Sequence, residues 1–181
     1  EMKGFSNIYT VVVDNSNDFS NDVGKDQKEN VKIINPNQNL GYSGGCNYGI
    51  DYAKKYLRCE YFMIMNPDVL IKKQAVIKMQ KILENLPMKS LLSCSTLYAC
   101  ENSSSGQKYN SLKVSGLRTK FIDVKQSLLR SDIFNGCLFM GRLSELPPKI
   151  FDERLFMYFE ELDFCLKNAD FSCYFTNEVQ C

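Results

Sequence analysis

The stretch MYFEELDFCLK, residues 157–167, places three acidic side chains directly after a run of aromatic ones. Glu160, Glu161 and Asp163 lie so close together that their negative charges repel one another unless solvent or a ligand offsets the repulsion. Carboxylates can act as general bases and can bind divalent cations. If a helix begins near Glu160, its dipole also stabilises carboxylates in the first turn, so a charged helix start is the structural alternative.

Helical geometry separates the three acids. Glu160, Asp163 and Lys167 fall on one face of a helix, whereas Glu161 points about 100° away from that face. The i,i+4 spacing of Asp163 and Lys167 suits a supporting ion pair. We therefore predict an ion pair within the helix and a glutamate that is available for another task.

Two further acids follow predicted strands. Asp14 closes the β-branched run of residues 8–15, and Asp68 follows Asn66 at the end of the apolar run of residues 60–69. A carboxylate at a strand end can accept hydrogen bonds from a nucleobase or ribose, or can bind Mg²⁺ or Mn²⁺ together with substrate phosphates. The alternative for both is turn chemistry, because Asp and Asn-Pro-Asp are also favoured in turns.

A glycine-rich stretch, NLGYSGGCNYG, covers residues 39–49. Glycine lets the backbone approach a ligand closely, and the amides at a helix N-terminus favour phosphate. The stretch has neither the GxGxxG pattern nor the lysine of a P-loop, so a phosphate site and a tight turn both remain open.

The elements that must position these residues alternate between strand and helix. Such alternation predicts an α/β fold with a mostly parallel sheet and helices on both faces. Since ligands bind at the carboxyl ends of parallel strands, Asp14, the Gly41 to Asn47 loop and Asp68 are expected at one edge. The predicted strands are residues 8–15, 31–37, 60–69, 90–99 and 135–142, and the predicted helices are 44–57, 75–86 and 160–169. Short strands or a hairpin are predicted within 113–125.

Composition excludes several classes of function. The formal net charge of +1 gives no reason to expect nucleic acid as a partner. The absence of histidine excludes an imidazole base within this chain. The eight cysteines show no CxxC pair, which favours buried free thiols in a reducing cytoplasm over a disulfide framework. No apolar run approaches the roughly 20 residues that span a bilayer.

Five stretches together, in this order, resemble family 2 glycosyltransferases with a GT-A fold, particularly the rhamnosyltransferase-like branch. They run from about Thr10 to Lys167 and read VVVDNSND, NQNLGYSGGCNYGI, MIMNPDV, FNGCLFMGR and FDERLFMYFEELDFCLK. The resemblance covers most of the chain. It implies one GT-A domain over residues 1–181, which we expect to be a piece of a longer protein that lacks the first strand of the fold.

The resemblance also implies a role for each matched residue. Asp68 looks like the last acid of a DxD-type motif, which binds Mg²⁺ or Mn²⁺ on the diphosphate, and Glu161 stands at the catalytic base. Gly136 looks like part of the sugar and acceptor pocket, with Glu160 and Asp163 as supporting acids, and the aromatic residues before Glu160 are expected to wall the acceptor site. The positions that match those near the nucleotide and donor are Asp14, Asn15, Ser16, Gly41, Gly44, Gly45, Asn47 and Asn66.

The implied function is inverting, metal-dependent transfer of a hexosyl or rhamnosyl group from a nucleotide-diphosphate sugar to a glycan or lipid-linked acceptor. Its expected setting is surface polysaccharide synthesis in the cytoplasm, either in solution or in peripheral association with the inner face of the membrane. The family usually has Asp where this chain has Glu161. This difference motivates an alternative, a catalytically impaired GT-A-like binding domain. A nucleotidyltransferase ranks last, because the glycine-rich stretch contains no Lys or Arg.

Overall fold

The computed structural model of the chain describes residues 8–16, 30–98, 107–109, 112–115, 118–121 and 126–181. The chain divides into two compact units. The first unit comprises Glu1–Cys59 and Pro147–Glu160, and the second comprises Glu60–Leu146 and Glu161–Cys181. The polar compositions of residues 16–30 and 100–111 predict surface loops, and most of these residues lie outside the described ranges. The expectation of a single domain over the whole chain stays a prediction.

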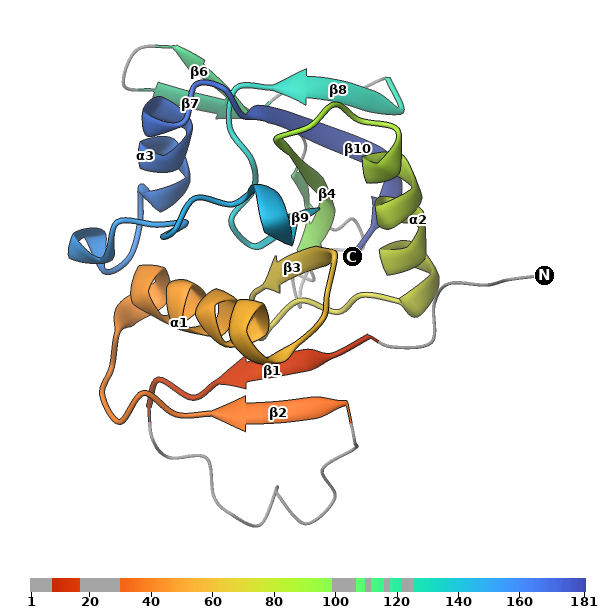
Figure 1. Cartoon of the computed structure of the whole chain (residues 1–181). Coiled ribbons are helices and arrows are strands. Elements are labelled where there is room, and N and C mark those ends of the chain that lie inside the picture. The colour runs from red at the N-terminus through yellow and green to blue at the C-terminus, as the bar shows by residue number, and fades with distance from the viewer. Residues whose placement is uncertain (1–7, 17–29, 99–106, 110–111, 116–117, 122–125) are drawn as a thin grey trace. The chain divides into compact units, whose positions relative to one another are not determined.

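The first unit contains a parallel strand pair covered by a helix. Strands β1 (Thr10–Val13) and β2 (Val31–Ile34) pair in parallel. Helix α1 (Gly41–Tyr56) lies over them in Figure 1. Both strands and the helix were predicted from the sequence, although the helix begins at Gly41 rather than at Gly44. This arrangement brings the carboxyl ends of β1 and β2 to one edge, next to each other.

The second unit contains a mixed sheet. Strands β3 (Tyr61–Met65), β4 (Ser90–Tyr98) and β10 (Ser172–Gln180) run in one direction. The strand order is β3-β9-β4-β10-β8, with β9 (Leu138–Arg142) and β8 (Leu128–Ser131) antiparallel to their neighbours. The α/β class is confirmed, but strand alternation along the chain did not reveal that an antiparallel strand separates β3 from β4.

Shorter strands complete the second unit. Strand β5 (Gln107–Tyr109) pairs with β4, and β6 (Leu112–Ser115) forms an antiparallel hairpin with β7 (Arg118–Phe121). Of the short strands or hairpin predicted within 113–125, the structure has the hairpin, over residues 112–121. Strands β8 and β10 were not predicted. Polar residues interrupt the apolar pattern of β10. In the structure its register with β4 shifts between Thr176 and Gln180.

Helices cover both faces of the sheet of the second unit. On one face, Met79 and Leu83 of α2 (Lys73–Glu84) belong to a core cluster with Leu138 and Met140 of β9. Side chains alternate along a strand, so Phe139 points to the opposite face. There the ring of Phe139 lies 4.4 Å from that of Phe134, which in turn lies 5.7 Å from Phe164 of α3 (Glu160–Lys167). Figure 1 shows α2 and α3 on opposite sides of β4 and β10. No helix within the described ranges has the length and apolar character needed to cross a bilayer.

Apolar residues recur at helical spacing along the predicted helix 75–86, and the structure buries the face that they form on α2. Met79 and Leu83 are fully buried, and the other apolar members of that face pack against them. These are Ala75, Val76, Ile82 and Leu86. The second unit therefore builds a core cluster on this helical pattern.

Arg142, at the end of β9, closes the C-terminus of α2. Its guanidinium donates to the carbonyl oxygens of Leu83, Leu86 and Pro87 at 2.6, 3.1 and 3.0 Å. It also lies 3.7 Å from the carboxylate of Glu145, a side chain only 4% exposed. Arg142 therefore satisfies backbone acceptors that a helix end leaves open, and it neutralises a buried charge.

We expect Arg142→Ala to lower the free energy of unfolding by about 2–3 kcal/mol, because it removes three hydrogen bonds at the end of α2 and the cation beside the Glu145 carboxylate. Urea denaturation followed by circular dichroism would measure this loss. Arg130→Ala is the matched control, since Arg130 makes one exposed hydrogen bond, to the Ser172 hydroxyl at 3.3 Å, and should change stability by less than about 0.5 kcal/mol. Equal stability of the two variants would contradict a capping role for Arg142.

The seven described cysteines are free thiols, as the sequence predicted. Two pairs lie close together in the second unit, with Sγ atoms 3.6 Å apart in Cys94 and Cys181 and in Cys165 and Cys173. The hydrogen bond from its neighbour lowers the pKa of Cys165, whereas the same hydrogen bond and burial raise the pKa of Cys173. Cys94 and Cys173 are buried in the core, and Cys181 packs against the cluster that contains Cys94.

Candidate active site

The pairing of β3 with β9 brings two loops of the second unit together. Met65 is opposite Leu138 at the end of the ladder, and the amide of Asn66 donates to the carbonyl of Cys137 at 2.9 Å. The turn that follows β3 carries Asp68, and the turn that precedes β9 carries Gly136 and Cys137. Segments about 70 residues apart in sequence thus meet at one corner of the sheet, because the strands are hydrogen-bonded neighbours.

Asp68 lies in a turn and faces solvent. The amide of Val69 donates to the carbonyl of Asn66 at 3.2 Å, and the Asp68 side chain is exposed. The turn that the Asn-Pro-Asp sequence favours is therefore present, and it leaves the Asp68 carboxylate exposed to solvent. In the part of the chain that the structure describes, no three His, Cys, Asp or Glu side chains gather to hold a metal by themselves. One exposed carboxylate instead suits Mg²⁺ or Mn²⁺ held largely by substrate phosphates.

Glu161 lies directly on Gly136. A Cβ atom built on Gly136 would fall 1.6 Å from Oε1 of Glu161 and 2.7 Å from its Cδ. The turn under it is held by Asn135, whose side-chain oxygen accepts from the Cys137 amide at 3.0 Å. The Asn135 amide in turn donates to the Ser93 hydroxyl of β4 at 2.9 Å. The carboxylate of Glu161 is therefore seated on a buried backbone turn that is tied to the sheet.

Asp68 and Glu161 both lie close to the Gly136–Cys137 turn, because Glu161 contacts Gly136 and Asn66, two residues before Asp68, donates to the Cys137 carbonyl. Burial raises the pKa of Cys137, and the negative charges of Asp68 and Glu161 raise it further. A charge changes the pKa of a thiol measurably only over a short distance, because solvent and salt screen the interaction between groups that are farther apart. The predicted metal-binding acid, which follows β3, and the predicted base, on α3, therefore lie beside one turn.

The acids of α3 have three different environments, although Glu160 and Asp163 were predicted to share one face. Asp163 forms the expected ion pair with Lys167 at 2.8 Å, which confirms that prediction. Glu160 is buried, and its Oε2 atom has no hydrogen-bond partner among the described residues. Glu161 is half-buried and lies on Gly136.

The aromatic run before α3 is exposed and has an unusual backbone. Phe156, Tyr158 and Phe159 have φ values of 58°, 73° and 68°, in the left-handed region that bulky residues rarely adopt. Their side chains are 47–72% exposed. Such strain is typical of functional segments. The predicted acceptor wall stays a prediction, with its side chains turned to solvent in the first unit.

Asp14 ends β1 with both carboxylate oxygens engaged. The Ser16 hydroxyl donates to Oδ1 at 3.0 Å, and the Asn35 side chain donates to Oδ2 at 3.1 Å. Asn35 was not predicted as a site residue. Its signal is positional, since Asn35 follows β2 just as Asp14 follows the parallel strand β1. The structure thus brings Asp14 and Ser16 together and adds Asn35 to the same strand edge.

Asn15 holds the start of α1 rather than projecting away from it. Its side-chain nitrogen donates to the Gly41 carbonyl at 2.9 Å, and its side-chain oxygen accepts from the Leu40 amide at 3.4 Å. A Cβ atom on Gly45 would fall 2.7 Å from that nitrogen. In this arrangement Asn15 and Gly45 join the end of β1 to the helix.

The other glycines at the start of α1 make room for neighbouring chain. Gly41 has φ +67°, and a Cβ atom there would fall 2.4 Å from the backbone oxygen of Phe156. A Cβ atom on Gly44 would fall 2.7 Å from Cβ of Leu40. The Ser43 amide donates to the same Phe156 oxygen at 3.2 Å, so a backbone carbonyl takes one of the helix N-terminal amides. These contacts show that the glycines allow close packing of the backbone within the first unit. The predicted phosphate contact stays a prediction.

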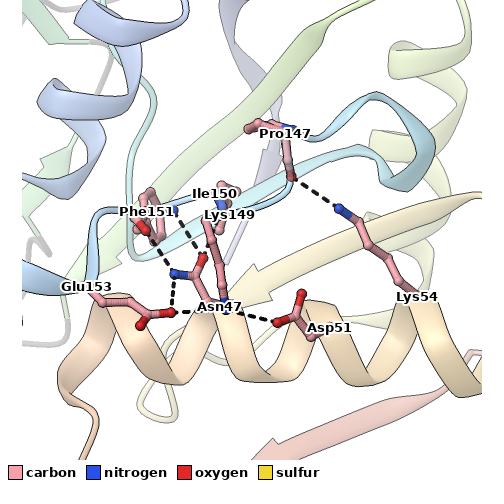
Figure 2. A network of polar contacts seen from close by, with 8 residues as sticks. All are labelled: Asn47, Asp51, Lys54, Pro147, Lys149, Ile150, Phe151 and Glu153. Atoms are coloured by element: carbon pink, nitrogen blue, oxygen red, sulfur yellow. Dashed lines mark hydrogen bonds and ion pairs between the residues drawn. The ribbon is translucent and has the colours of Figure 1, made fainter.

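The Asn47 side chain is buried inside the first unit and holds two segments of it together by hydrogen bonds. The sequence predicted a place for Asn47 near the nucleotide. Its side-chain nitrogen donates to the Phe151 carbonyl at 2.8 Å and to Glu153 Oε1 at 3.1 Å. Its side-chain oxygen accepts from the amides of Ile150 and Phe151 at 3.0 and 3.1 Å. Figure 2 shows these bonds around Asn47. An amide offers two donors and two acceptor positions, so the protein occupies all of them and leaves none for a ligand.

The comparisons with known proteins agree with the motifs. Residues 8–145 match the family described as glycosyl transferase family 2. The chain is also similar to the low-salt glycan biosynthesis hexosyltransferase Agl10 of Haloferax volcanii, with 28% identity over 162 residues. That match covers 87% of this chain and 52% of the relative, so the chain spans about half the length of the curated relative it matches. Because the family match covers most of the sequence, this chain belongs to glycosyl transferase family 2.

Proposed function

We propose that the chain carries the catalytic centre of an inverting glycosyltransferase that uses a nucleotide-diphosphate sugar. The observation that carries the proposal is that the Gly136–Cys137 turn contacts Glu161 and is hydrogen-bonded to Asn66, two residues before Asp68. Inverting transfer requires a base on one side of the sugar and charge neutralisation for the diphosphate on the other. Two carboxylates at one turn can divide these tasks, and family membership favours this chemistry over other uses of the pair.

In the proposed reaction Glu161 accepts the proton of the acceptor hydroxyl. The hydroxyl oxygen then forms a bond to the anomeric carbon from the face opposite the diphosphate. The bond between that carbon and the phosphate oxygen breaks, and its electron pair leaves with the nucleotide diphosphate. No covalent enzyme intermediate and no histidine are needed, which is consistent with the composition of the chain.

Asp68 is proposed to hold Mg²⁺ or Mn²⁺ with the substrate diphosphate. The cation would supply neutralisation of the charge that develops on the leaving diphosphate. An exposed carboxylate at the end of β3 is accessible to such a complex. Asp14, with Ser16 and Asn35, is proposed to contact the nucleoside, because this polar group ends two parallel strands of the first unit.

The donor and acceptor are proposed from the relatives. The name of Agl10 describes a hexosyltransferase of glycan biosynthesis, which supports hexosyl transfer here. Rhamnosyl transfer rests on the resemblance of the motifs. A glycan or lipid-linked acceptor, surface polysaccharide synthesis and a cytoplasmic place, in solution or at the inner face of the membrane, complete the proposal.

The donor site can be tested by thermal denaturation with a panel of nucleotide-diphosphate sugars, each with and without Mn²⁺. A ligand that binds only the folded protein stabilises it by about 2.7 kcal/mol at a concentration of 100 Kd, so the correct donor should raise Tm. We expect the Mn²⁺-dependent part of the shift to disappear in Asp68→Asn. Glu84→Gln is the matched control, because Glu84 is an exposed acid of the same unit that accepts from Gln80 at 3.0 Å.

The outcomes separate the proposal from its alternative. If no donor in the panel changes Tm and none is hydrolysed or transferred, the proposed function is wrong. If donors bind with Mn²⁺ but no acceptor or water ever receives the sugar, the chain is a binding domain of the same fold. The reason for considering that alternative is that this chain has Glu161 where the family usually has an aspartate.

A further inference from the structure

We propose that Gly136 is a positioning residue for Glu161, and that the space left by its missing side chain is what allows a glutamate to serve as the base. The proposal rests on the proposed function and deepens it, since it explains how the longer side chain fits the site. It concerns a pair of residues that are 25 positions apart in sequence and in contact in the second unit.

A Cβ atom at position 136 would occupy the place that the Glu161 carboxylate takes. Oε1, Cδ and Cγ of Glu161 would lie 1.6, 2.7 and 3.2 Å from a Cβ atom on Gly136. Carbon atoms in favourable contact are about 3.5–4.0 Å apart. A methyl group at Gly136 therefore requires the Glu161 carboxylate to move by more than about 1 Å, a misplacement that can cost about 100-fold in rate.

The carboxylate is the part that should move, because the turn is held firmly. Asn135 accepts from the Cys137 amide at 3.0 Å with its side chain and from the Leu138 amide at 3.3 Å with its backbone carbonyl. Its own amide is bonded to Ser93 at 2.9 Å. Glu161 reaches the turn only with the end of a flexible side chain. We therefore expect Gly136→Ala to fold normally and to displace the carboxylate.

Side-chain length couples the two positions. A glutamate spans the gap to Gly136 and lies over its Cα, whereas an aspartate would be shorter by one methylene group and would withdraw from that space. A methyl group at position 136 should then matter only when the residue at 161 is long enough to occupy the same volume. This dependence is the feature that a general packing role for Gly136 would lack.

The activity test is a double-mutant cycle with the full-length protein. We expect Gly136→Ala alone to lower kcat by about 100-fold, with KM for the donor changed by less than about 3-fold. In the Glu161→Asp background the same change should cost less than about 3-fold, because the oxygen that would fall 1.6 Å from the Cβ atom is gone. If the two losses multiply, the positions are independent and the proposal is wrong.

A second readout does not depend on catalysis. The Cys137 thiol responds to the charge of Glu161, and its pKa can be measured from the pH dependence of iodoacetamide labelling followed by peptide mass spectrometry. Gly136→Ala should shift that pKa in the wild-type background by more than in the Glu161→Gln background, where no charge is displaced. Equal shifts in both backgrounds would overturn the proposal.

The two readouts distinguish failure of the proposal from failure of the proposed function. If the wild-type protein transfers no sugar but the thiol shifts differ between backgrounds, Gly136 positions Glu161 and the proposed function is wrong. If the protein is an active enzyme but neither the rates nor the thiol shifts are coupled, the proposed function stands and Gly136 does not position Glu161.

Discussion

Replacing Glu161 by glutamine is expected to lower kcat for sugar transfer by about 100- to 10,000-fold, the range that a positioned general base contributes. Glutamine keeps the size of the side chain and can still lie over Gly136, but it cannot accept the proton of the acceptor hydroxyl. Donor binding should persist, because Asp68 and the turn after β3 are unchanged. Steady-state kinetics with the donor identified by thermal denaturation, together with a direct Kd for that donor, would separate the two effects.

The matched control is Glu178→Gln on β10. Glu178 is an exposed acid of the same unit that forms an ion pair with Lys78 at 3.0 Å. Surface ion pairs contribute about 0–1 kcal/mol to stability, so this variant should fold and transfer sugar at nearly the wild-type rate. Wild-type turnover in Glu161→Gln would exclude Glu161 as the base and would favour water or another group in that role.

Replacing Asn47 by alanine is expected to lower the free energy of unfolding by roughly 3–5 kcal/mol, since several buried backbone groups lose their partners at once. The amides of Ile150 and Phe151 would lose their shared acceptor, and the Phe151 carbonyl would lose a donor. Asn47 is only 1% exposed, so water cannot readily replace the lost bonds. Urea denaturation monitored by circular dichroism would measure the change.

Lys54→Ala on the same helix is the control for Asn47. Lys54 is exposed and makes one hydrogen bond, to the Pro147 carbonyl at 3.2 Å, which Figure 2 shows beside the Asn47 network. Its removal should cost less than about 1 kcal/mol. If Asn47→Ala is as stable as Lys54→Ala but loses donor binding, the buried tie is not the main role of Asn47, and the nucleotide contact predicted from the sequence is restored.

Helix periodicity and strand ends could be interpreted from the sequence alone. The apolar face of α2, the ion pair of Asp163 with Lys167 and the parallel strands β1 and β2 were all predicted, and each depends on residues close together in the chain. The strand-end positions of Asp14 and Asp68 belong to the same class. Local spacing determines these features, because the period of a helix or strand decides which side chains share a face.

Contacts between distant segments were decided by the tertiary structure. The place of β9 between β3 and β4 is a pairing of strands from different parts of the chain. The same is true of the bonds from Asn47 to residues more than 100 positions away. No local pattern encodes them, since many partners would satisfy the same hydrogen-bonding groups and packing selects among the partners.

The acids of MYFEELDFCLK show, within one stretch, what the sequence determines and what only the tertiary structure decides. The sequence determined that Glu161 leaves the face shared by Glu160, Asp163 and Lys167, because about 100° of rotation per residue separates neighbours on a helix. Only the tertiary structure decided where Glu161 goes, which is onto Gly136 beside the turn after which β9 pairs with β3. That contact depends on a missing side chain, and a glycine in a sequence does not reveal which neighbour fills the space it leaves.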